Sequence, residues 1–179
     1  NSNKGELFGV RYIGNDKELP SIIQNYNDCY AVLGIGGNSE FFDKRNYKFN
    51  EVKKIGYKTP ILVSPGATID DSVQIGSGTV IFDGSYIDFG VRIGSNSIIN
   101  LNSTICHDCY IGNNVVLSPK TVIAGGCFID DGCFLGTNST LNPHLSIKPG
   151  CIIGSGAIVT KNLDQKGVYV GNPARKKNS

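Results

Sequence analysis

The sequence contains two histidines, and one of them, His107, is followed directly by an acidic residue, Asp108. An imidazole titrates near neutral pH, and a neighbouring carboxylate can orient it as a general base. The pair is therefore a candidate for proton abstraction during acyl transfer, although its spacing alone fits an ordinary surface histidine equally well. The second histidine, His144, is interpreted as an exposed turn residue.

A period of six residues organises the chain around this pair. From Val63 to Val159 an aliphatic side chain returns at every sixth position, which fits neither an α-helix nor a simple alternating strand. Four residues after each aliphatic comes a mostly small side chain, and three residues after it comes mostly glycine, asparagine or aspartate, which accept positive φ in tight turns. Each hexad is thus a short strand and a turn. Three hexads close a triangular coil, so we predict a parallel β-helix whose coils stack at about 4.8 Å.

The same repeat explains most of the six cysteines. Cys109, Cys127, Cys133 and Cys151 occupy the small inward position, where a thiol is a compact apolar filler. Cys106 should point outward while Cys109 points inward. This argues against a redox pair or a zinc site, since both need two sulfurs on one side.

The repeat, with its Ile-Gly pairs at Ile75-Gly76, Ile93-Gly94, Ile111-Gly112 and Ile153-Gly154, resembles the hexapeptide acyltransferases. This resemblance implies a left-handed β-helix. The segment from Ile105 to Gly112 is similar to the His-Asp/Glu-Cys-x-Ile-Gly segment of bacterial nucleotide-sugar N-acetyltransferases, such as the enzyme that acetylates a UDP-4-amino sugar in bacillosamine synthesis, and of related sialic acid O-acetyltransferases. By resemblance, His107 is the general base and Asp108 raises its basicity.

Residues 1–62 are expected to form a small α/β domain, residues 63–162 the β-helix and residues 163–179 a tail near the coenzyme. We expect strands over 9–13 and 31–35, a short helix from Asp16 with Pro20 in its first turn, and a helix over 39–55. Ser39 is the candidate N-cap of that helix, and Gly56 should end it.

The resemblance also implies substrate contacts in the first domain. The Gly-His-Gly loop and Asp-Asp pair of the subgroup have no counterpart here, so we interpret the domain as truncated, either in a fragment or in a shortened natural variant. The Gly-rich turn from Gly34 to Asn38 follows an expected strand and precedes an expected helix. Its N–H groups at Gly36 and Asn38 are candidates for binding the nucleotide sugar, although a plain tight turn fits as well.

Acetyl-CoA is the expected co-substrate, with no metal. By resemblance, Asn100 helps to hold the amino sugar and Gly125 donates its N–H to the thioester oxygen, although a turn asparagine and a plain glycine corner are the alternatives. Arg175 in the tail is a candidate for binding the coenzyme 3′-phosphate, and a solvated basic tail fits equally well. Val116 replaces a second histidine that contacts acetyl-CoA in a relative, so that contact cannot be polar here. The complete set of expected coenzyme contacts is Val116, Gly125, Thr137, Ser155 and Arg175.

Outward positions 18 residues apart should stack in columns, and one column is apolar throughout: Val80, Ile98, Val116, Phe134 and Ile152. A continuous apolar stripe should be covered. We interpret it as a subunit interface, and the resemblance implies a homotrimer with active sites between neighbouring prisms.

The preferred interpretation is an acetyl-CoA-dependent N-acetyltransferase acting on a UDP- or dTDP-linked 4-amino-deoxy sugar, used for bacterial surface glycan or glycoprotein synthesis. O-acetylation of a sialic acid-like sugar is the nearest alternative, and a non-catalytic β-helix scaffold is the second. A zinc lyase of the carbonic anhydrase type needs three histidines per metal, a pattern that His107 and His144 do not match. A net charge of +2 is too weak to indicate nucleic acid. Without a long apolar run or a signal peptide, we expect a cytoplasmic protein with no membrane insertion.

Overall fold

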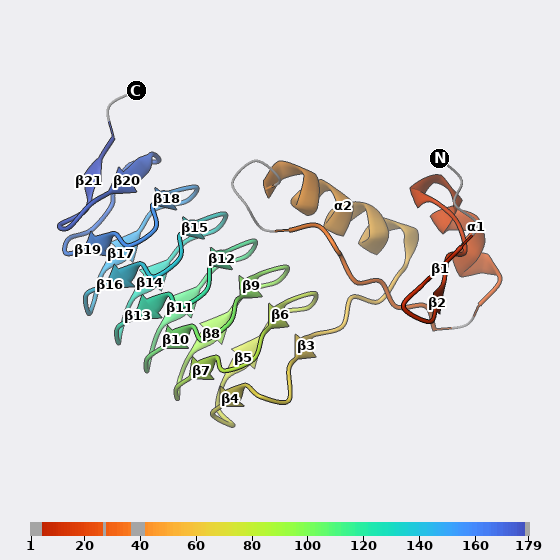
Figure 1. Ribbon diagram of the computed structural model, residues 1–179, viewed down its shortest axis with the longest axis horizontal. Coiled ribbons are helices and arrows are strands. Elements are labelled where there is room, and N and C mark those ends of the chain that lie inside the picture. Colours follow the sequence, from red (N-terminus) through yellow and green to blue (C-terminus); the bar gives the residue numbers. More distant parts are fainter. Residues whose placement is uncertain (1–4, 27, 37–41, 178–179) are drawn as a thin grey trace.

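The computed structural model divides into a long β-helix and a smaller N-terminal unit beside it (Figure 1). It describes residues 5–26, 28–36 and 42–177. None of the helices in these residues is long and apolar enough to cross a lipid bilayer.

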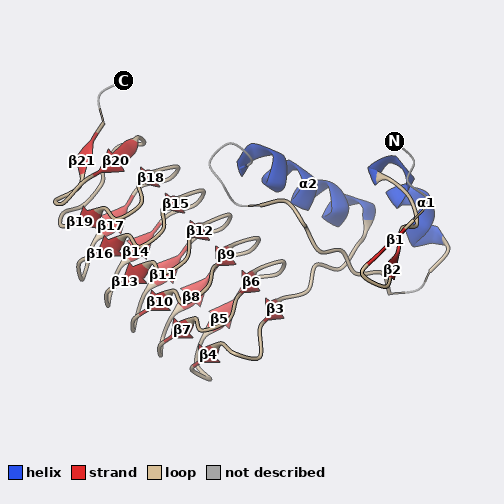
Figure 2. Cartoon of the chain, in the orientation of Figure 1, coloured by secondary structure: helices blue, strands red, loops and turns tan. Residues whose placement is uncertain are grey.

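The β-helix is built from two-residue strands separated by four-residue turns, as the hexad period predicts (Figure 2). In chain order the strands are β3 (Leu62–Val63), β4 (Thr68–Ile69), β5 (Gln74–Ile75), β6 (Val80–Ile81), β7 (Tyr86–Ile87), β8 (Arg92–Ile93), β9 (Ile98–Ile99), β10 (Thr104–Ile105), β11 (Tyr110–Ile111), β12 (Val116–Leu117), β13 (Val122–Ile123), β14 (Phe128–Ile129), β15 (Phe134–Leu135), β16 (Thr140–Leu141), β17 (Ser146–Ile147), β18 (Ile152–Ile153) and β19 (Ile158–Val159).

Every third strand pairs in parallel, which produces three sheets. The first sheet has the order β3-β6-β9-β12-β15-β18, extended by two strands of the tail. The second has the order β4-β7-β10-β13-β16-β19, and the third β5-β8-β11-β14-β17. The register is 18 residues throughout, so Thr104 faces Val122 and Tyr110 faces Phe128. The predicted columns of outward side chains are therefore confirmed.

The core runs along the axis of the β-helix. From Ile81 to Val159 the aliphatic residues of the hexad are buried, and the cysteines at the small inward position are buried as well. Cys106 is only partly buried, whereas Cys109 is inside, as predicted. All six thiols are free.

The turns adopt the left-handed conformation where the sequence predicts it, for example at Asn96 and Asp108. Two further residues at the same hexad position, Lys120 and His144, also have positive φ, which is unusual for lysine. The backbone hydrogen bonds of the coil above and below impose the turn there. His144 is exposed, which confirms its interpretation.

The N-terminal unit contains the hairpin of β1 (Glu6–Leu7) and β2 (Val10–Arg11), the 3₁₀ turn η1 (Asp16–Glu18), and helices α1 (Leu19–Gln24) and α2 (Phe42–Ile55). Pro20 lies in the first turn of α1, as predicted. Gly56, at φ 110°, follows α2 and ends it. Ser39 lies outside the described residues.

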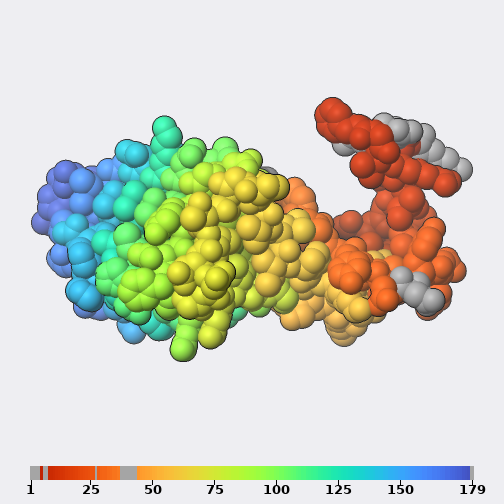
Figure 3. Space-filling view, turned by 90° about the horizontal axis from the view of Figure 1, so that it is seen from below, coloured from red at the N-terminus to blue at the C-terminus, as the bar shows by residue number. Residues whose placement is uncertain are grey.

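Salt bridges and side-chain hydrogen bonds fasten this unit together. Lys48 bridges Asp16 at 2.9 Å and Glu51 at 2.7 Å, and the Tyr57 hydroxyl donates to the Leu19 carbonyl at 2.8 Å. These contacts tie η1, α1 and α2 into one cluster. Figure 3 shows this N-terminal part extending beyond the β-helix.

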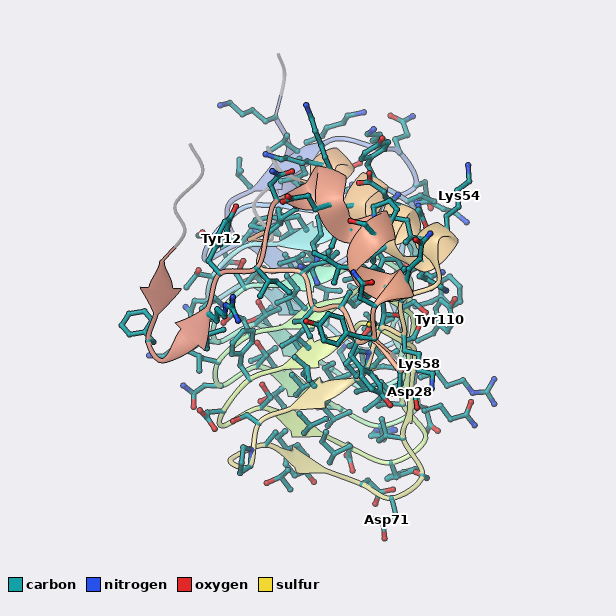
Figure 4. All side chains as sticks on the ribbon, turned by 90° about the vertical axis from the view of Figure 1, so that its right-hand side faces the viewer. Tyr12, Asp28, Lys54, Lys58, Asp71 and Tyr110 are labelled. Carbon is teal, nitrogen blue, oxygen red and sulfur yellow. The ribbon has the colours of Figure 1, made fainter. Side chains whose placement is uncertain are left out.

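The strand expected over 9–13 is shorter, covering Val10–Arg11 alone, and the strand expected over 31–35 is wrong. There, only Tyr30 forms a parallel bridge, with Lys58. The ladder stops because Pro60 follows two residues later and has no N–H to donate. Lys58 also forms a salt bridge of 2.5 Å with Asp28, next to this β-bridge (Figure 4).

The apolar stripe on the first sheet is covered at its centre within a single chain. Ile98 is 8% exposed and Val116 4% exposed, and α2 lies on this side of the β-helix (Figure 1). Phe49 of α2 packs onto Gly78, where an added Cβ would lie 2.4 Å from the ring. The centre of the stripe is thus already buried within one chain, whereas Val80, Phe134 and Ile152 are only partly buried, and a subunit interface on this stripe stays a prediction.

The C-terminal tail continues the first sheet. Strand β20 (Val168–Val170) pairs in parallel with β18, and β21 (Arg175–Lys176) pairs antiparallel with β20. The basic residues of the tail thus lie at the C-terminal end of the β-helix.

The buried aliphatic column leads to a stability prediction. Ile129 is fully buried among its neighbours, so Ile129→Ala should lower the free energy of unfolding by about 2–5 kcal/mol and Ile129→Val by about 0.5–1.5 kcal/mol. Urea denaturation at one fixed protein concentration measures both. Equal stability of wild type and Ile129→Ala would contradict the inward orientation of this column.

Candidate active site

The candidate base sits in the turn between β10 and β11. Ile105 and Cys109 are buried on either side of this turn, which forces the residues between them outward. The His107 side chain is 47% exposed, and its Nδ1 lies 3.0 Å from Oδ2 of Asp108. Asp108 has φ 56°, and this left-handed backbone turns its carboxylate toward the imidazole.

This pairing determines what the imidazole can do. If Nδ1 carries the proton and donates it to the carboxylate, Nε2 keeps its lone pair and can accept a proton. The carboxylate also stabilises the imidazolium that results. The structure thus brings the two predicted residues together in the arrangement that a general base needs.

Gly125 lies one coil above His107 on the same edge. A Cβ built on Gly125 would lie only 2.5 Å from Nε2 of His107, so a side chain at this position would collide with the imidazole. The adjacent Gly126 N–H donates to the carbonyl of His107 at 2.9 Å. The imidazole of the candidate base is therefore packed closely against the Gly125 backbone.

The N–H of Gly125 is free because of the residue that precedes it. At Phe89 and Asp131 the equivalent N–H is bonded to the side chain of the preceding aspartate, at 2.9 and 3.1 Å. Ala124 offers no such acceptor, and among the described residues the Gly125 N–H has no hydrogen-bond partner. An unbonded N–H beside a base is a suitable donor to a developing oxyanion.

The same reasoning applies to Thr137 and Ser155, which follow Gly136 and Gly154. Neither N–H has a partner within the described ranges. Both residues lie on another edge of the β-helix, formed by the turns 100–103, 118–121, 136–139 and 154–157. We call this the Asn100 edge. The turns 88–91, 106–109, 124–127 and 142–145 form the His107 edge.

The third edge, formed by the turns 94–97, 112–115, 130–133 and 148–151, differs. In the coils above His107, the N–H of Asn113 donates to Oδ1 of Asp131 and the N–H of Asp131 donates to Oδ1 of Asp130. The third equivalent residue, Pro149, has no N–H. In the coils above His107, the unbonded N–H groups of Gly125, Thr137 and Ser155 thus lie on the two edges that flank the second sheet.

Asn100 lies on the Asn100 edge and not beside His107. Its Oδ1 accepts the N–H of Leu101 at 2.9 Å, which leaves its side-chain N–H groups for a ligand. Within one chain, the structure therefore places His107, Asp108 and Gly125 together, and Asn100, Thr137 and Ser155 on a separate edge.

The remaining predicted residues are more scattered. Val116 belongs to the first sheet and is almost completely buried in the single chain, and its expected contact with the coenzyme stays a prediction. Arg175 is exposed on β21, where its own Nη1 donates to the Ala174 carbonyl at 3.0 Å.

In the Gly-rich turn, Gly36 has open space around it, and Asn38 lies outside the described residues. Nη1 of buried Arg45 donates to the carbonyls of Leu33 and Ile35 at 3.1 and 2.9 Å. Burial lowers the pKa of this guanidinium. Arg45 thus holds the segment that the sequence predicted to be a strand.

The sequence interpretation missed one neighbour of the base. The ring of Phe89 stacks on the imidazole of His107 with centroids 5.4 Å apart and planes 11° apart. The sequence could have indicated this contact, because Phe89 and His107 are 18 positions apart and therefore stack on the same edge. Among the residues that the structure describes, no group of three His, Cys, Asp or Glu side chains could hold a metal ion.

Comparison with known proteins adds a repeat profile and a fold. Residues 90–125 match the profile described as "Bacterial transferase hexapeptide (six repeats)". Comparison with curated protein sequences gives no match.

Solved structures match almost the whole chain. PerB from Caulobacter crescentus, in complex with CoA and GDP-perosamine, is 26% identical with a TM-score of 0.90, over 99% of this chain and 83% of that one. The acetyltransferase domain of PglB from Neisseria gonorrhoeae, in complex with acetyl coenzyme A, is 24% identical with a TM-score of 0.88, over 99% and 83%. WeeI from Acinetobacter baumannii is 28% identical with a TM-score of 0.85, over 97% and 81%.

These matches confirm the left-handed β-helix and the resemblance stated from the sequence. The chain carries the hexapeptide repeat of bacterial transferases and has the fold of these acetyltransferase structures.

Proposed function

We propose that this protein is an acetyl-CoA-dependent N-acetyltransferase acting on the amino group of a nucleotide-linked 4-amino sugar. The observation that carries the proposal is the His107–Asp108 pair next to Gly125, whose N–H has no partner among the described residues. The comparisons support it, because PerB holds CoA and GDP-perosamine and the PglB domain holds acetyl coenzyme A. We place the reaction in the cytoplasm.

The reaction follows from these groups. The sugar amine attacks the thioester carbonyl, and Nε2 of His107 takes the proton that the nitrogen loses. The Gly125 N–H donates to the oxygen as negative charge develops there. The tetrahedral intermediate then releases coenzyme A as thiolate, which the imidazolium can protonate, and the sugar keeps the acetyl group as an amide. Asp108 holds the imidazolium in place throughout.

The division of the site between two edges favours a homotrimer. If the second sheets of three prisms face a common axis, the His107 edge of one subunit meets the Asn100 edge of the next. Tyr86 and Val122, which point outward from the second sheet, are exposed in the single chain, whereas the centre of the first sheet is covered. We therefore assign the subunit interface to the second sheet rather than to the apolar stripe that includes Val80, Phe134 and Ile152.

Gly36, with Asn38 beyond the described residues, belongs in this proposal to the nucleotide-sugar site, and Asn100 to the amino-sugar site. Thr137 and Ser155 offer main-chain donors to the pantetheine arm, and Arg175 a cation to the 3′-phosphate. O-acetylation of a sialic acid-like sugar uses the same base, so the acceptor panel below decides between the two reactions.

The first prediction concerns the base. His107→Ala should lower kcat by about 10²- to 10⁴-fold, as expected for the loss of a general base. CoA release is measured by chromatography with acetyl-CoA and UDP-, dTDP- and GDP-linked 4-amino sugars and free sialic acids as acceptors. His144→Ala is the matched control, since it removes an exposed histidine on the same edge, and it should keep wild-type activity. A folded wild type that binds no acetyl-CoA and turns over no acceptor would favour the scaffold alternative.

The second prediction concerns Gly125. Gly125→Ala places a methyl carbon only 2.5 Å from Nε2 of His107, so the imidazole must move and kcat should fall by about 10²-fold. Gly5→Ala, at a glycine with open space around it, is the control for the substitution itself. Full activity of Gly125→Ala would show that this close approach plays no part in catalysis.

The third prediction concerns the interface. Val122→Lys introduces a charge on the second sheet and should convert the trimer into monomers, as measured by light scattering after size-exclusion chromatography. Phe128→Lys introduces the same charge at an exposed position of the third sheet and should leave the trimer intact. Trimers from both variants would argue against the second sheet as the interface.

A further inference from the structure

The imidazole of His107 is flanked by two different surfaces. Above it lies the backbone of Gly125, close enough that a Cβ would be 2.5 Å from Nε2. Below it lies the ring of Phe89, nearly parallel to the imidazole, with a centroid distance of 5.4 Å. Oδ2 of Asp108 lies 3.0 Å from Nδ1 of the same imidazole.

The backbone of Phe89 is fixed on both sides. Its N–H donates to Oδ1 of Asp88 at 2.9 Å, and its carbonyl accepts the N–H of Asp108 at 3.0 Å. The N–H of Gly90 donates to Ser72 Oγ at 2.9 Å. The turn that carries the ring is thus tied to the coil below and to the turn that carries the base.

The turn itself does not require an aromatic side chain. The equivalent positions on the His107 edge are Asp71, His107, Gly125 and Pro143, which share no side-chain chemistry. Phe89 is 50% exposed, so the ring gains little from burial in the core. The stacking contact with His107 is the specific interaction that it makes.

We propose that Phe89 is a positioning residue for His107, forming with Gly125 a slot that holds the imidazole plane while Asp108 fixes its rotation. This inference rests on the proposed function, because a positioning role matters only if His107 is the general base. An aromatic face within about 6 Å also attracts a cation. The ring therefore supports the imidazolium that forms when Nε2 takes a proton from the acceptor.

The test compares Phe89→Leu, which removes the ring, with Phe89→Tyr, which keeps it. The carbon-bound protons of His107 are observed by NMR in ¹⁵N-histidine-labelled full-length protein, with His144 as the internal reference. Phe89→Leu should abolish the ring-current shift of His107 and leave His144 unchanged. Phe89→Tyr should keep the wild-type shift. A wild-type His107 spectrum in folded Phe89→Leu would overturn the proposal.

Kinetics supply a second readout. Phe89→Leu should lower kcat by about 10-fold with little change in the KM for acetyl-CoA, because the base is misplaced while the coenzyme contacts are intact. Phe89→Tyr should restore kcat. Unchanged kcat in Phe89→Leu, measured in an active enzyme, would overturn the positioning role. If the wild-type protein acetylates no acceptor but the NMR shift of His107 still depends on Phe89, the proposed function is wrong, whereas the packing of His107 between Phe89 and Gly125 is confirmed.

Discussion

The hydrogen bonds between successive coils are the interaction on which the rest of this structure depends. Each coil satisfies its backbone groups against the next one, as where the N–H of Tyr110 donates to the carbonyl of Cys127 at 2.9 Å. Because this pairing has a register of 18 residues, any side chain is placed directly above and below its equivalents. Phe89, His107 and Gly125 form one column for that reason, and the candidate site draws residues from three successive coils.

The repeat made most of the fold predictable. An aliphatic residue every six positions specifies the strands, and glycine, asparagine or aspartate three positions later specifies the turns, so the register and the inward thiols follow directly. The N-terminal unit has no such period. The expected strand over 31–35 fails because Pro60 ends the pairing and Arg45 binds the free carbonyls, and neither effect can be inferred from a local pattern.

The site was predictable in part for the same reason. The His107–Asp108 pair is adjacent in sequence, and a left-handed turn brings its side chains together. The unbonded N–H groups depend on the residue that directly precedes each of them, and the buried state of Val116 contrasts with exposed Val122, the outward residue of the next strand. The first is a local property of the sequence, whereas the period does not specify the second.

The four inward cysteines have a consequence for how the β-helix opens. Cys109, Cys127, Cys133 and Cys151 are buried, and burial raises the pKa of the Cys133 thiol to about 12. Such thiols react with alkylating reagents only when their coil separates from its neighbours and water enters. In a solenoid each coil contacts only the next. The rates at which these four thiols are alkylated should therefore report how often the part of the β-helix around each thiol opens.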